Sequence, residues 1–467
     1  MTQIRGTQVP SSSAKSLTGA FKFAKLRAGY TTDVPTVVDL FSGAGGLSEG
    51  FRQAGFAVLA GSDNDPDALA TFSINFPEAE VILGDIRNPE VKSRILVAAR
   101  AATVLVGGPP CQAFSQVRNH TRLIDDPRNS LYKEFVSTLG DALPMAFVME
   151  NVTGMDQMGV REQIRTDLSL DGAYDVVAQV ADAVDFGVPQ TRKRLLFIGV
   201  RADKGMTPPV LRGSGAADSA TLTRFTGARR PRYQLVVQQH VLSLHLGSAL
   251  ENPDSLAAVT AQQALSDLAG LEVGNRADVL PRSSLPAPAS AYQKLMRDGS
   301  GDTIANVQVP RIHPDTALRL QGIPQGGNFR DLEDALLERY ITGKRWGQDN
   351  GTGRLSRQHF YAYRRLHPAI WAWTLNTKAD SVYHYDAARA LSVREFARLQ
   401  SFPDRFVFTT DPRKGALDGR HDGGSAHSRY RQVGNAVPPL LAKSVAQSIV
   451  VELNALRARE GIRAKTG

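Results

Sequence analysis

Residues 36–46 of this chain read TVVDLFSGAGG, an apolar run that passes directly into a glycine-rich turn. Residues 47–54 follow with apolar side chains at helical spacing. This order predicts a buried strand, a tight turn and then a helix, because glycine permits backbone angles that other residues avoid. Such a turn also lets the backbone approach a bound ligand closely. It is no P-loop, since no Gly-Lys-Ser/Thr follows, and by itself it is typical of many nucleotide-binding folds.

The same alternation of short apolar runs and amphipathic stretches continues to about residue 200. It predicts an α/β fold with a largely parallel sheet, helices on both faces and right-handed crossovers. The expected strands are Thr36–Phe41, Ala57–Ser62, Val81–Leu83, Thr103–Val106, Ala146–Met149, Val176–Val180 and Arg194–Val200. The expected helices are Leu47–Ala54, Asp67–Asn75, Val91–Arg100, Ser130–Leu143, Leu391–Leu399 and Leu440–Leu456.

The composition narrows the class of protein. The chain has 467 residues, a net charge of +9 and one cysteine. A single cysteine excludes an intrachain disulfide framework and leaves no Cys pair for structural zinc. The first thirty residues lack the continuous apolar core of a signal peptide, and no apolar run approaches the length of a membrane span. We therefore expect a soluble intracellular protein whose positive charge suits a polyanion, although many basic proteins bind none.

After residue 200 the amino-acid composition and the hydrophobic pattern of the sequence change. Residues 203–232 are rich in Gly, Pro, Ser and Arg, which is a linker composition. We expect three parts: a flexible basic arm at 1–32, a main domain formed by 33–205 together with 389–460, and a smaller irregular domain at 206–388. Arginine and aromatic side chains interleave in Arg354–Arg365, which indicates either a nucleic-acid surface or a solvated surface with aromatics in a local core.

Acidic residues follow two further strands at the edge where the glycine-rich turn is expected. Asp63 comes directly after the second strand, and Gly84-Asp85-Ile86 follows the third. The carboxyl ends of parallel strands form a ligand-binding edge, and an acid there can accept hydrogen bonds from ribose hydroxyls. Three ligand-facing turns together indicate a pocket for an adenosine-containing cofactor, although each acid alone would suit a helix N-cap.

The one cysteine lies in residues 107–112, which read GGPPCQ. The two prolines end the preceding strand because neither can donate to a sheet ladder. Cys111 is therefore presented at the carboxyl edge of the sheet, where a nucleophile would be useful. The alternative is a small buried hydrophobe, the commonest fate of a free cysteine.

Two more kinds of charged group are expected at this edge. Glu150 ends a later strand, where a partly desolvated carboxyl suits a proton donor, with a capping or ion-paired residue as the alternative. Gln190–Arg194 precedes the last strand and puts Arg192 and Arg194 on one face of an extended segment. Two guanidiniums that converge on an acid and a thiol would stabilise both anions, whereas a solvated basic turn is the alternative.

These motifs together resemble the cytosine-C5 DNA methyltransferase family, over about residues 35–200 and 388–448. The motifs stand in the family's order: Asp39–Gly46, Gly84-Asp85-Ile86, Pro109-Pro110-Cys111-Gln112, Glu150-Asn151-Val152, Gln190–Arg194, Arg394–Pro403 and Gly434–Pro439. Other stretches resemble the family's cofactor-packing and connecting segments: Asp125–Leu131, Val259–Leu268 and Ile304–Gly326. The resemblance implies a Rossmann-like class I methyltransferase domain and a target-recognition domain at 206–388.

The resemblance also implies an activity, that of a DNA (cytosine-5-)-methyltransferase using S-adenosyl-L-methionine. The thiolate of Cys111 would add to C6 of cytosine while Glu150 hydrogen-bonds or protonates N3. Arg192 and Arg194 would orient Glu150, the O2 carbonyl and the backbone phosphate, and Gln112 belongs to the same catalytic set. Covalent catalysis of this kind divides one difficult step into easier ones.

The resemblance assigns a cofactor pocket as well, and no metal site. The residues expected to contact the cofactor are Phe41, Ser42, Gly43, Ala44, Gly45, Gly46, Asp63, Asn64, Asp85, Ile86, Pro109, Leu131, Asn435 and Val437. Asp63 would hold the ribose and Asp85 the adenine amino group. The family usually has Glu where this chain has Asp63, so the shorter side chain keeps the charge but loosens the ribose contact.

On the DNA side, the resemblance implies that the target base leaves the stack. The segment Ala113–Asp126 would be the mobile loop that closes over the base. The residues expected to contact DNA are Ser115, Gln116, Val117 and Arg118 in that loop, and Arg354, Arg364 and Arg365 in the recognition domain. The expected state is a monomer in the prokaryotic cytoplasm, at the nucleoid and without a membrane. Its expected partners are double-stranded DNA and a cognate restriction or defence system.

Two alternatives share the motifs or the fold. A tRNA cytosine-5 methyltransferase has the same catalytic residues, but the long interval between Val200 and Leu391 favours a DNA-recognition domain. A catalytically silent DNA-binding relative would have no need of an intact Cys111, Glu150 and Arg194.

Overall fold

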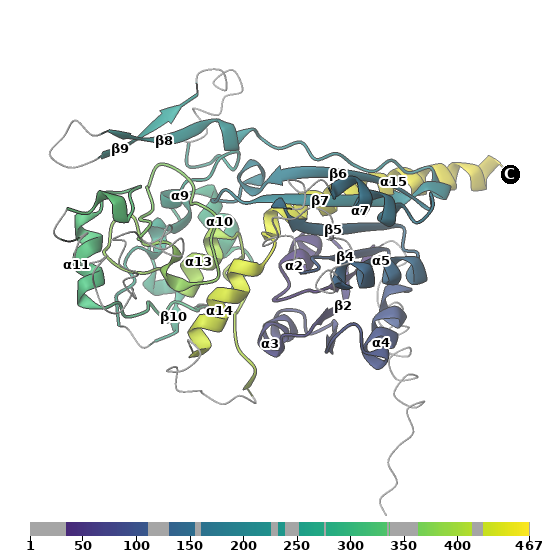
Figure 1. The fold of residues 1–467 in the computed structure, drawn as a ribbon, viewed down its shortest axis with the longest axis horizontal. Coiled ribbons are helices and arrows are strands. Elements are labelled where there is room, and N and C mark those ends of the chain that lie inside the picture. The colour runs from purple at the N-terminus through teal and green to yellow at the C-terminus, as the bar shows by residue number, and fades with distance from the viewer. Residues whose placement is uncertain are drawn as a thin grey trace, which may run out of the picture.

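The computed structural model describes residues 34–110, 130–154, 160–225, 232–238, 252–274, 277–333, 336, 363–412 and 424–466. The predicted N-terminal arm at 1–32 lies outside this part of the chain. The described fold is built around one seven-stranded sheet with helices on both faces (Figure 1).

The order of the strands in this sheet is β3-β2-β1-β4-β5-β7-β6. Their bounds are β1 Thr36–Leu40, β2 Ala57–Asp63, β3 Glu80–Leu83, β4 Val104–Gly107, β5 Ala146–Val152, β6 Tyr174–Asp182 and β7 Lys193–Arg201. β1 to β5 pair in parallel, whereas β7 runs antiparallel to both β5 and β6. The largely parallel sheet predicted from the sequence is confirmed, and each predicted strand is present with ends shifted by at most three residues.

Two hydrophobic clusters cover the two faces of the sheet, because side chains alternate across each strand. Val37 of β1 belongs to the first cluster and its neighbour Val38 to the second. The first cluster includes side chains from α2 (Gly46–Gln53), α3 (Pro66–Asn75) and α15 (Pro439–Thr466). The second includes side chains from α4 (Pro89–Ala99), α5 (Ser130–Ala142) and α7 (Arg161–Ser169).

Side-chain caps begin two of the helices that follow the sheet's carboxyl edge, α3 and α4. Asp65 accepts a hydrogen bond from the N–H of Asp67 at 3.0 Å and begins α3, with Pro66 at its first position. Asn88 begins α4 in the same way. A cap of this kind satisfies one of the unpaired N–H groups of the first turn. The turns before these two helices are therefore locally defined, and both helices begin within two residues of their predicted starts.

Beyond β7 the described chain forms mainly short elements, drawn to the left of and above the sheet in Figure 1. They are β8 (Ala220–Phe225), β9 (Arg232–Val237), α9 (Ala261–Leu265), β10 (Val279–Pro281), α10 (Ala291–Arg297), β11 (Thr303–Ala305), α11 (Pro314–Gly322), α13 (Val393–Leu399) and α14 (Gly424–Asn435). β8 pairs with β9 and β10 with β11, both antiparallel. α9 and α10 share the first hydrophobic cluster with α13 and α15, so this region packs on the main body. The domain boundaries at 206 and 388 stay a prediction.

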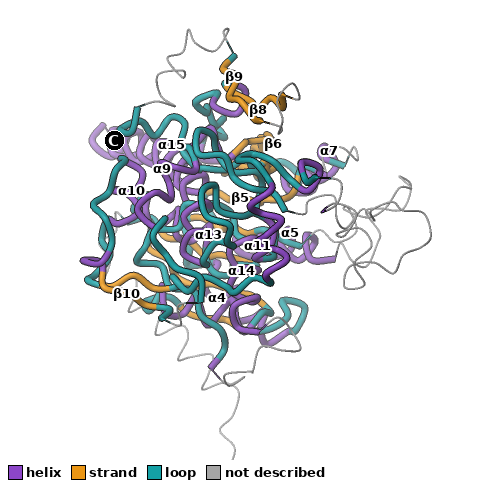
Figure 2. Tube along the Cα trace, turned by 90° about the vertical axis from the view of Figure 1, so that its left-hand side faces the viewer, coloured by secondary structure: helices purple, strands orange, loops and turns teal. Residues whose placement is uncertain are grey.

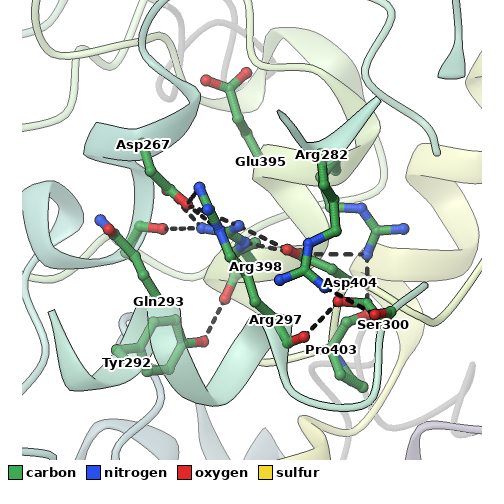
Figure 3. Close-up of polar contacts among 12 residues, drawn as sticks. Asp267, Arg282, Tyr292, Gln293, Arg297, Ser300, Glu395, Arg398, Pro403 and Asp404 are labelled. Atoms are coloured by element: carbon green, nitrogen blue, oxygen red, sulfur yellow. Dashed lines mark hydrogen bonds and ion pairs between the residues drawn. The ribbon is translucent and has the colours of Figure 1, made fainter. Parts of the chain in front are cut away.

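A buried ion network joins the segment after α9 to α10 and α13 (Figure 3). The guanidinium of Arg398 lies 2.7 Å from Asp267 and 2.7 Å from Asp404. Arg297 pairs with the same Asp267, and the hydroxyl of Tyr292 donates to the carbonyl of Arg398 at 2.5 Å. All five side chains are buried. Each charge faces an opposite charge, which is what keeps a buried ion tolerable.

One helical stretch, His427–Glu460, is long and apolar enough by composition to cross a membrane. Of its most apolar window, 56% is buried inside the molecule. Leu441, Val445 and Ile449 of α15 belong to the first hydrophobic cluster. This stretch is an exception to the expectation that no apolar run approaches the length of a membrane span. Packing of α15 in the hydrophobic core explains its apolar side chains.

Candidate active site

A cavity of about 640 Å³ lies at the carboxyl ends of the parallel strands. Its lining comes from the turns after β1, β2, β3 and β4, from the end of β5, from the residues around the start of β7 and from the α14–α15 connection. Segments far apart in the sequence therefore meet at the edge where open α/β folds bind ligands. All of the residues predicted to bind the cofactor line this cavity except Gly45.

The two glycines that begin α2 are required by close packing. Gly45 caps the helix with φ +98°, and a Cβ there would lie 2.5 Å from the ring of Phe76. A Cβ on Gly46 would lie 2.3 Å from the carbonyl oxygen of Val437. The connection between α14 and α15 can close on the start of α2 only because Gly46 has no side chain. Beside this turn, the buried hydroxyl of Ser42 has no hydrogen-bond partner among the described residues.

Asp63 supports the glycine-rich turn while it faces the cavity. Its carboxyl oxygens accept hydrogen bonds from the N–H groups of Gly43 and Asp65, both at 2.8 Å. Burial raises the pKa of Asp63 above its ordinary value, and the backbone donors oppose that shift. Because Asp65 is the N-cap of α3, the capping alternative does not apply to Asp63.

Asp85 lies at an exposed part of the lining and pairs with Arg87. The carboxylate accepts from the Arg87 Nη2 at 2.5 Å and from its Nε at 2.9 Å. The hydrogen bonds from Arg87 hold the pKa of Asp85 below its ordinary value. Arg87 and Arg431 are lining cations that the sequence interpretation missed, and Arg431 lies 2.9 Å from Asp65. Arg87 could have been predicted from the sequence, because it follows the predicted cofactor residue Asp85 by two positions.

Glu150 and Arg194 form an ion pair in the lining of the cavity. The Nε of Arg194 lies 2.5 Å from the Oε1 of Glu150, and each side chain is 12% exposed. Arg194 of β7 lies opposite Val152 of β5, two residues beyond Glu150 and thus on the same face of the sheet. A Cβ on Gly108 would lie 2.9 Å from the Oε2 of Glu150, so the glycine leaves room for this carboxylate.

The side chain of Arg192 makes contacts other than the expected ones. Its guanidinium is buried and donates to the carbonyl oxygens of Leu375 at 3.2 Å and Gly434 at 2.6 Å. Its Nε has no hydrogen-bond partner in the part of the chain that the structure describes. Burial and then the nearby charge of Arg194 hold the pKa of Arg192 well below its ordinary value. The expected contact with Glu150 is made by Arg194, while Arg192 holds the end of α14, directly before the α14–α15 connection.

Two buried glutamines hold this connection from its other side. Gln400 donates to the carbonyl of Ala436 at 2.5 Å. Gln190 in turn donates to the carbonyl of Leu399 at 2.9 Å and to the side chain of Gln400. Both glutamines belong to predicted motifs, but no role was predicted for either. The chain of hydrogen bonds keeps the predicted cofactor residues of the connection at the cavity.

With this geometry in place, the comparison with known proteins identifies the family. Residues 35–451 match the family model described as C-5 cytosine-specific DNA methylase. The chain belongs to this family. It is 30% identical over 464 residues to the Type II methyltransferase M.AgeI of Thalassovita gelatinovora, with 89% of this chain and 99% of the relative covered. It is 36% identical to the Type II methyltransferase M.NgoPII of Neisseria gonorrhoeae, with coverage of 88% and 94%.

As a member of the family this methylase is a DNA (cytosine-5-)-methyltransferase. A solved prophage-encoded DNA modification methyltransferase from E. coli has a similar fold, with a TM-score of 0.61 and 23% identity. The match covers 90% of the methylase described here and 99% of that chain. The Rossmann-like α/β fold predicted from the sequence is therefore confirmed.

Several predicted site residues of the methylase lie outside the described residues: Cys111, Gln112, Ser115, Gln116, Val117, Arg118 and Arg354. Pro109 and Pro110, the last described residues before Cys111, line the cavity. The side chain of Asn151 donates to the carbonyl of Pro109 at 3.1 Å. The residue that directly precedes the predicted nucleophile therefore lines the cavity.

Arg364 and Arg365 of the methylase, both predicted to contact DNA, have contacts within the fold. Arg365 is half-buried and donates to three carbonyl oxygens, those of Leu320 at 3.1 Å, Ile323 at 2.7 Å and Asp386 at 2.8 Å. Burial lowers its pKa from the ordinary value. The guanidinium of Arg364 lies 5.4 Å from the centre of the Trp373 ring. Arg365 is thus occupied in holding its own fold, and DNA contact by this pair stays a prediction that its geometry does not favour.

Proposed function

We propose that this methyltransferase transfers a methyl group from S-adenosylmethionine to C5 of a flipped cytosine in a specific sequence of duplex DNA, through a covalent bond between Cys111 and C6. One observation carries the proposal: the Glu150–Arg194 pair and the glycine-rich turn line the same cavity. A proton donor for the base and a pocket for the methyl donor are then adjacent. The chain continues from that cavity wall into Cys111.

The residues of the cavity fit S-adenosylmethionine. The volume of about 640 Å³ lies within the usual range of small-molecule sites, roughly 300–1,000 Å³. The hydroxyl of Ser42, unpartnered within the described chain, suits the methionine end, Asp63 the ribose and Asp85 the adenine amino group. The cofactor, when bound, supplies an electrophilic methyl group. The lining residues would orient it and exclude water from the reaction.

The catalytic residues of the chain act on the base. As the thiolate of Cys111 forms a bond to C6, the electrons of the C5–C6 double bond shift to C4–C5, those of the C4–N3 double bond shift to N3, and Glu150 gives a proton to N3. Arg194 keeps the carboxyl of Glu150 in place and would donate a hydrogen bond to the O2 carbonyl. Once C5 is methylated, N3 returns its proton to Glu150, H5 leaves as a proton, and expulsion of the thiolate of Cys111 restores the C5–C6 double bond.

The proposed setting is the prokaryotic cytoplasm, where the monomer would act on double-stranded DNA at the nucleoid. The net charge of +9 favours association with the phosphate backbone. Relatives that are named Type II methyltransferases support a cognate restriction or defence system as the biological context. Flipping the target base out of the stack costs a few kcal/mol, which contacts to the protein must offset.

Methyl transfer by the purified protein tests this function. With labelled S-adenosylmethionine we expect transfer to duplex DNA and none to tRNA, and transfer to tRNA alone would assign a different substrate. Cys111→Ala should reduce transfer to background and leave cofactor binding, measured by calorimetry, unchanged. Persistent turnover by that variant would contradict the covalent mechanism. A duplex with 5-fluorocytosine should trap a complex that survives denaturing electrophoresis, because fluorine cannot leave as a proton.

A further inference from the structure

The strands β8 and β9 form a two-stranded ribbon separate from the seven-stranded sheet. The ribbon lies at the upper left in Figure 1 and at the top of the molecule in Figure 2. No third strand pairs with either of its edges within the described chain. A two-stranded ribbon alone is marginally stable in water, so contacts to the rest of the fold must hold it.

The inner face of the ribbon supplies these contacts. Leu222 and Leu235 lie opposite each other and pack against a hydrophobic cluster of the body. Further along, the Nε of Arg224 lies 2.7 Å from one carboxylate oxygen of Asp331, and the hydroxyl of Tyr233 donates to the other at 2.9 Å. The side chain of Asp331 is buried. The ribbon is therefore held by its inner face in one orientation.

The outer face of the ribbon is exposed. Its six residues are three cross-strand pairs: Thr221 with Val236, Thr223 with Gln234, and Phe225 with Arg232. All six side chains are exposed, whereas the alternate residues are mostly buried or half-buried. Arg232 makes no ion pair with any residue that the structure describes. The fold thus presents a narrow exposed surface of hydroxyl, amide, guanidinium and two apolar groups on the described part of the ribbon.

The charge of this region suits a polyanion. Residues 219–250 contain four arginines and no Asp or Glu, and one of the four, Arg224, is paired with Asp331 on the inner face. Four of the six outer-face side chains are polar or charged, which is unlike the apolar centre of a protein–protein interface. Hydroxyl and amide groups instead match the donors and acceptors of base edges and phosphates.

The ribbon is rooted at the same edge of the sheet as the cavity. Ala220, at the start of β8, shares a hydrophobic cluster with Val184 and Trp371. The residue after Trp371 forms a β-bridge with Gln190, four residues before Arg194. A duplex seated on the ribbon would therefore lie on the side of the molecule where the target base must enter.

We propose that the outer face of the β8–β9 ribbon enters a groove of the duplex substrate and helps to select its sequence. This inference rests on the proposed function and names a surface through which that function recognises DNA. The major groove of B-DNA is about 12 Å wide and admits a two-stranded ribbon. Thr223 and Gln234 then face base edges, Phe225 and Val236 suit thymine methyl groups, and Arg232 suits a phosphate.

Equilibrium binding tests the ribbon without depending on catalysis. The probes are a duplex that the wild-type protein selects from a random library and a duplex of the same composition in scrambled order. We expect the double variant Thr223→Ala/Gln234→Ala to lower the ratio of the two affinities about 10-fold or more. Arg232→Ala should weaken binding to both duplexes alike and reduce the slope of log affinity against log salt by about one.

Matched variants elsewhere control for composition and charge. Thr303→Ala/Gln447→Ala and Arg457→Ala remove equally exposed side chains from β11 and α15 and should leave both readouts at wild-type values. If the ribbon variants behave like these controls while circular dichroism shows them folded, the ribbon does not contact DNA. A wild-type protein that selects a duplex without methylating it would contradict the proposed function. The affinities of the ribbon variants would still test whether the ribbon contacts DNA.

Discussion

Three ionisable side chains around the cavity are buried and are compensated in different ways. Asp39 accepts hydrogen bonds from the backbone N–H and the hydroxyl of Ser48 through one oxygen, while its other oxygen has no partner within the described chain. Asp63 accepts two backbone N–H groups, and Arg192 donates to two carbonyls. None of the three forms an ion pair with a residue that the structure describes, and burial shifts each pKa in the direction of the neutral form. At the scale of single residues, these three groups therefore depend on hydrogen bonds, whereas Glu150, Asp85 and Asp65 of the cavity lining have arginine partners.

The buried carboxyl of Asp39 should make stability depend on pH. Burial raises its pKa to about 7, so between about pH 4 and 7 the folded state holds a proton that the unfolded state has lost. Stability from this group is present at low pH and is lost as the pH rises through 7. Between about pH 5 and 8 we expect Asp39→Asn to gain about 2–3 kcal/mol relative to wild type, measured by urea unfolding. Parallel pH profiles of the two proteins would contradict the assignment.

At the scale of elements, the cavity exists because α2 and the chain between α14 and α15 approach each other closely. Gly46 meets the carbonyl of Val437 at the start of α2, and Gly50 lets the next turn of the helix pack on Ala442 of α15. A side chain at either position would push the two helices apart. The predicted cofactor residues of the C-terminal connection thus reach the pocket through a packing contact rather than through their own sequence.

The substitution Gly46→Ala tests this contact. The added Cβ would lie 2.3 Å from the carbonyl oxygen of Val437, so the connection must move away from the pocket. Overpacking of this kind costs about 1–3 kcal/mol, and we expect the affinity for S-adenosylmethionine, measured by calorimetry, to fall about 10-fold or more. Gly270→Ala is the matched control, because a Cβ there meets nothing within 4 Å. Equal affinities for the two variants would show that the connection does not form the pocket.

At the scale of the whole molecule, buried ion pairs connect the parts of the chain. Arg398 of α13 joins Asp267 and Asp404, and the buried Glu49 of α2 pairs with Arg405 just beyond them. The helix α2 beside the cavity and the region of α9 and α10 are therefore linked through the segment around α13. Desolvated charges of this kind leave a large penalty when one partner is lost.

Removal of Asp267 should therefore destabilise the protein strongly. The variant Asp267→Ala leaves Arg297 and part of Arg398 without their anion, and we expect the free energy of unfolding to fall by about 3–5 kcal/mol. Glu162→Ala removes one partner of an exposed pair with Arg165, 2.8 Å apart, and should cost less than about 1 kcal/mol. Both are read from denaturant unfolding. A loss at Asp267 no larger than that at Glu162 would mean that the network does not hold these parts together.

The sequence alone determined the strands, the order of the motifs and most of the cavity lining. Short continuous apolar runs and glycine or proline turns act locally, so Thr36–Leu40 could be predicted as a strand without knowledge of its spatial neighbours. The carboxyl ends of parallel strands must share one edge, and the turns at Asp63 and Asp85 therefore met as expected. Glu150 lay beside that pocket for the same reason.

The tertiary structure alone decided which partner each charged side chain takes. Arg192 bonds carbonyls 183 and 242 residues away, and Arg365 bonds carbonyls of neighbouring segments where DNA contact was expected. The sequence does not show whether the partner of an arginine is a phosphate, a carboxylate or a carbonyl. Its partner depends on which segments pack around it and how much water they exclude, and that is a property of the folded molecule.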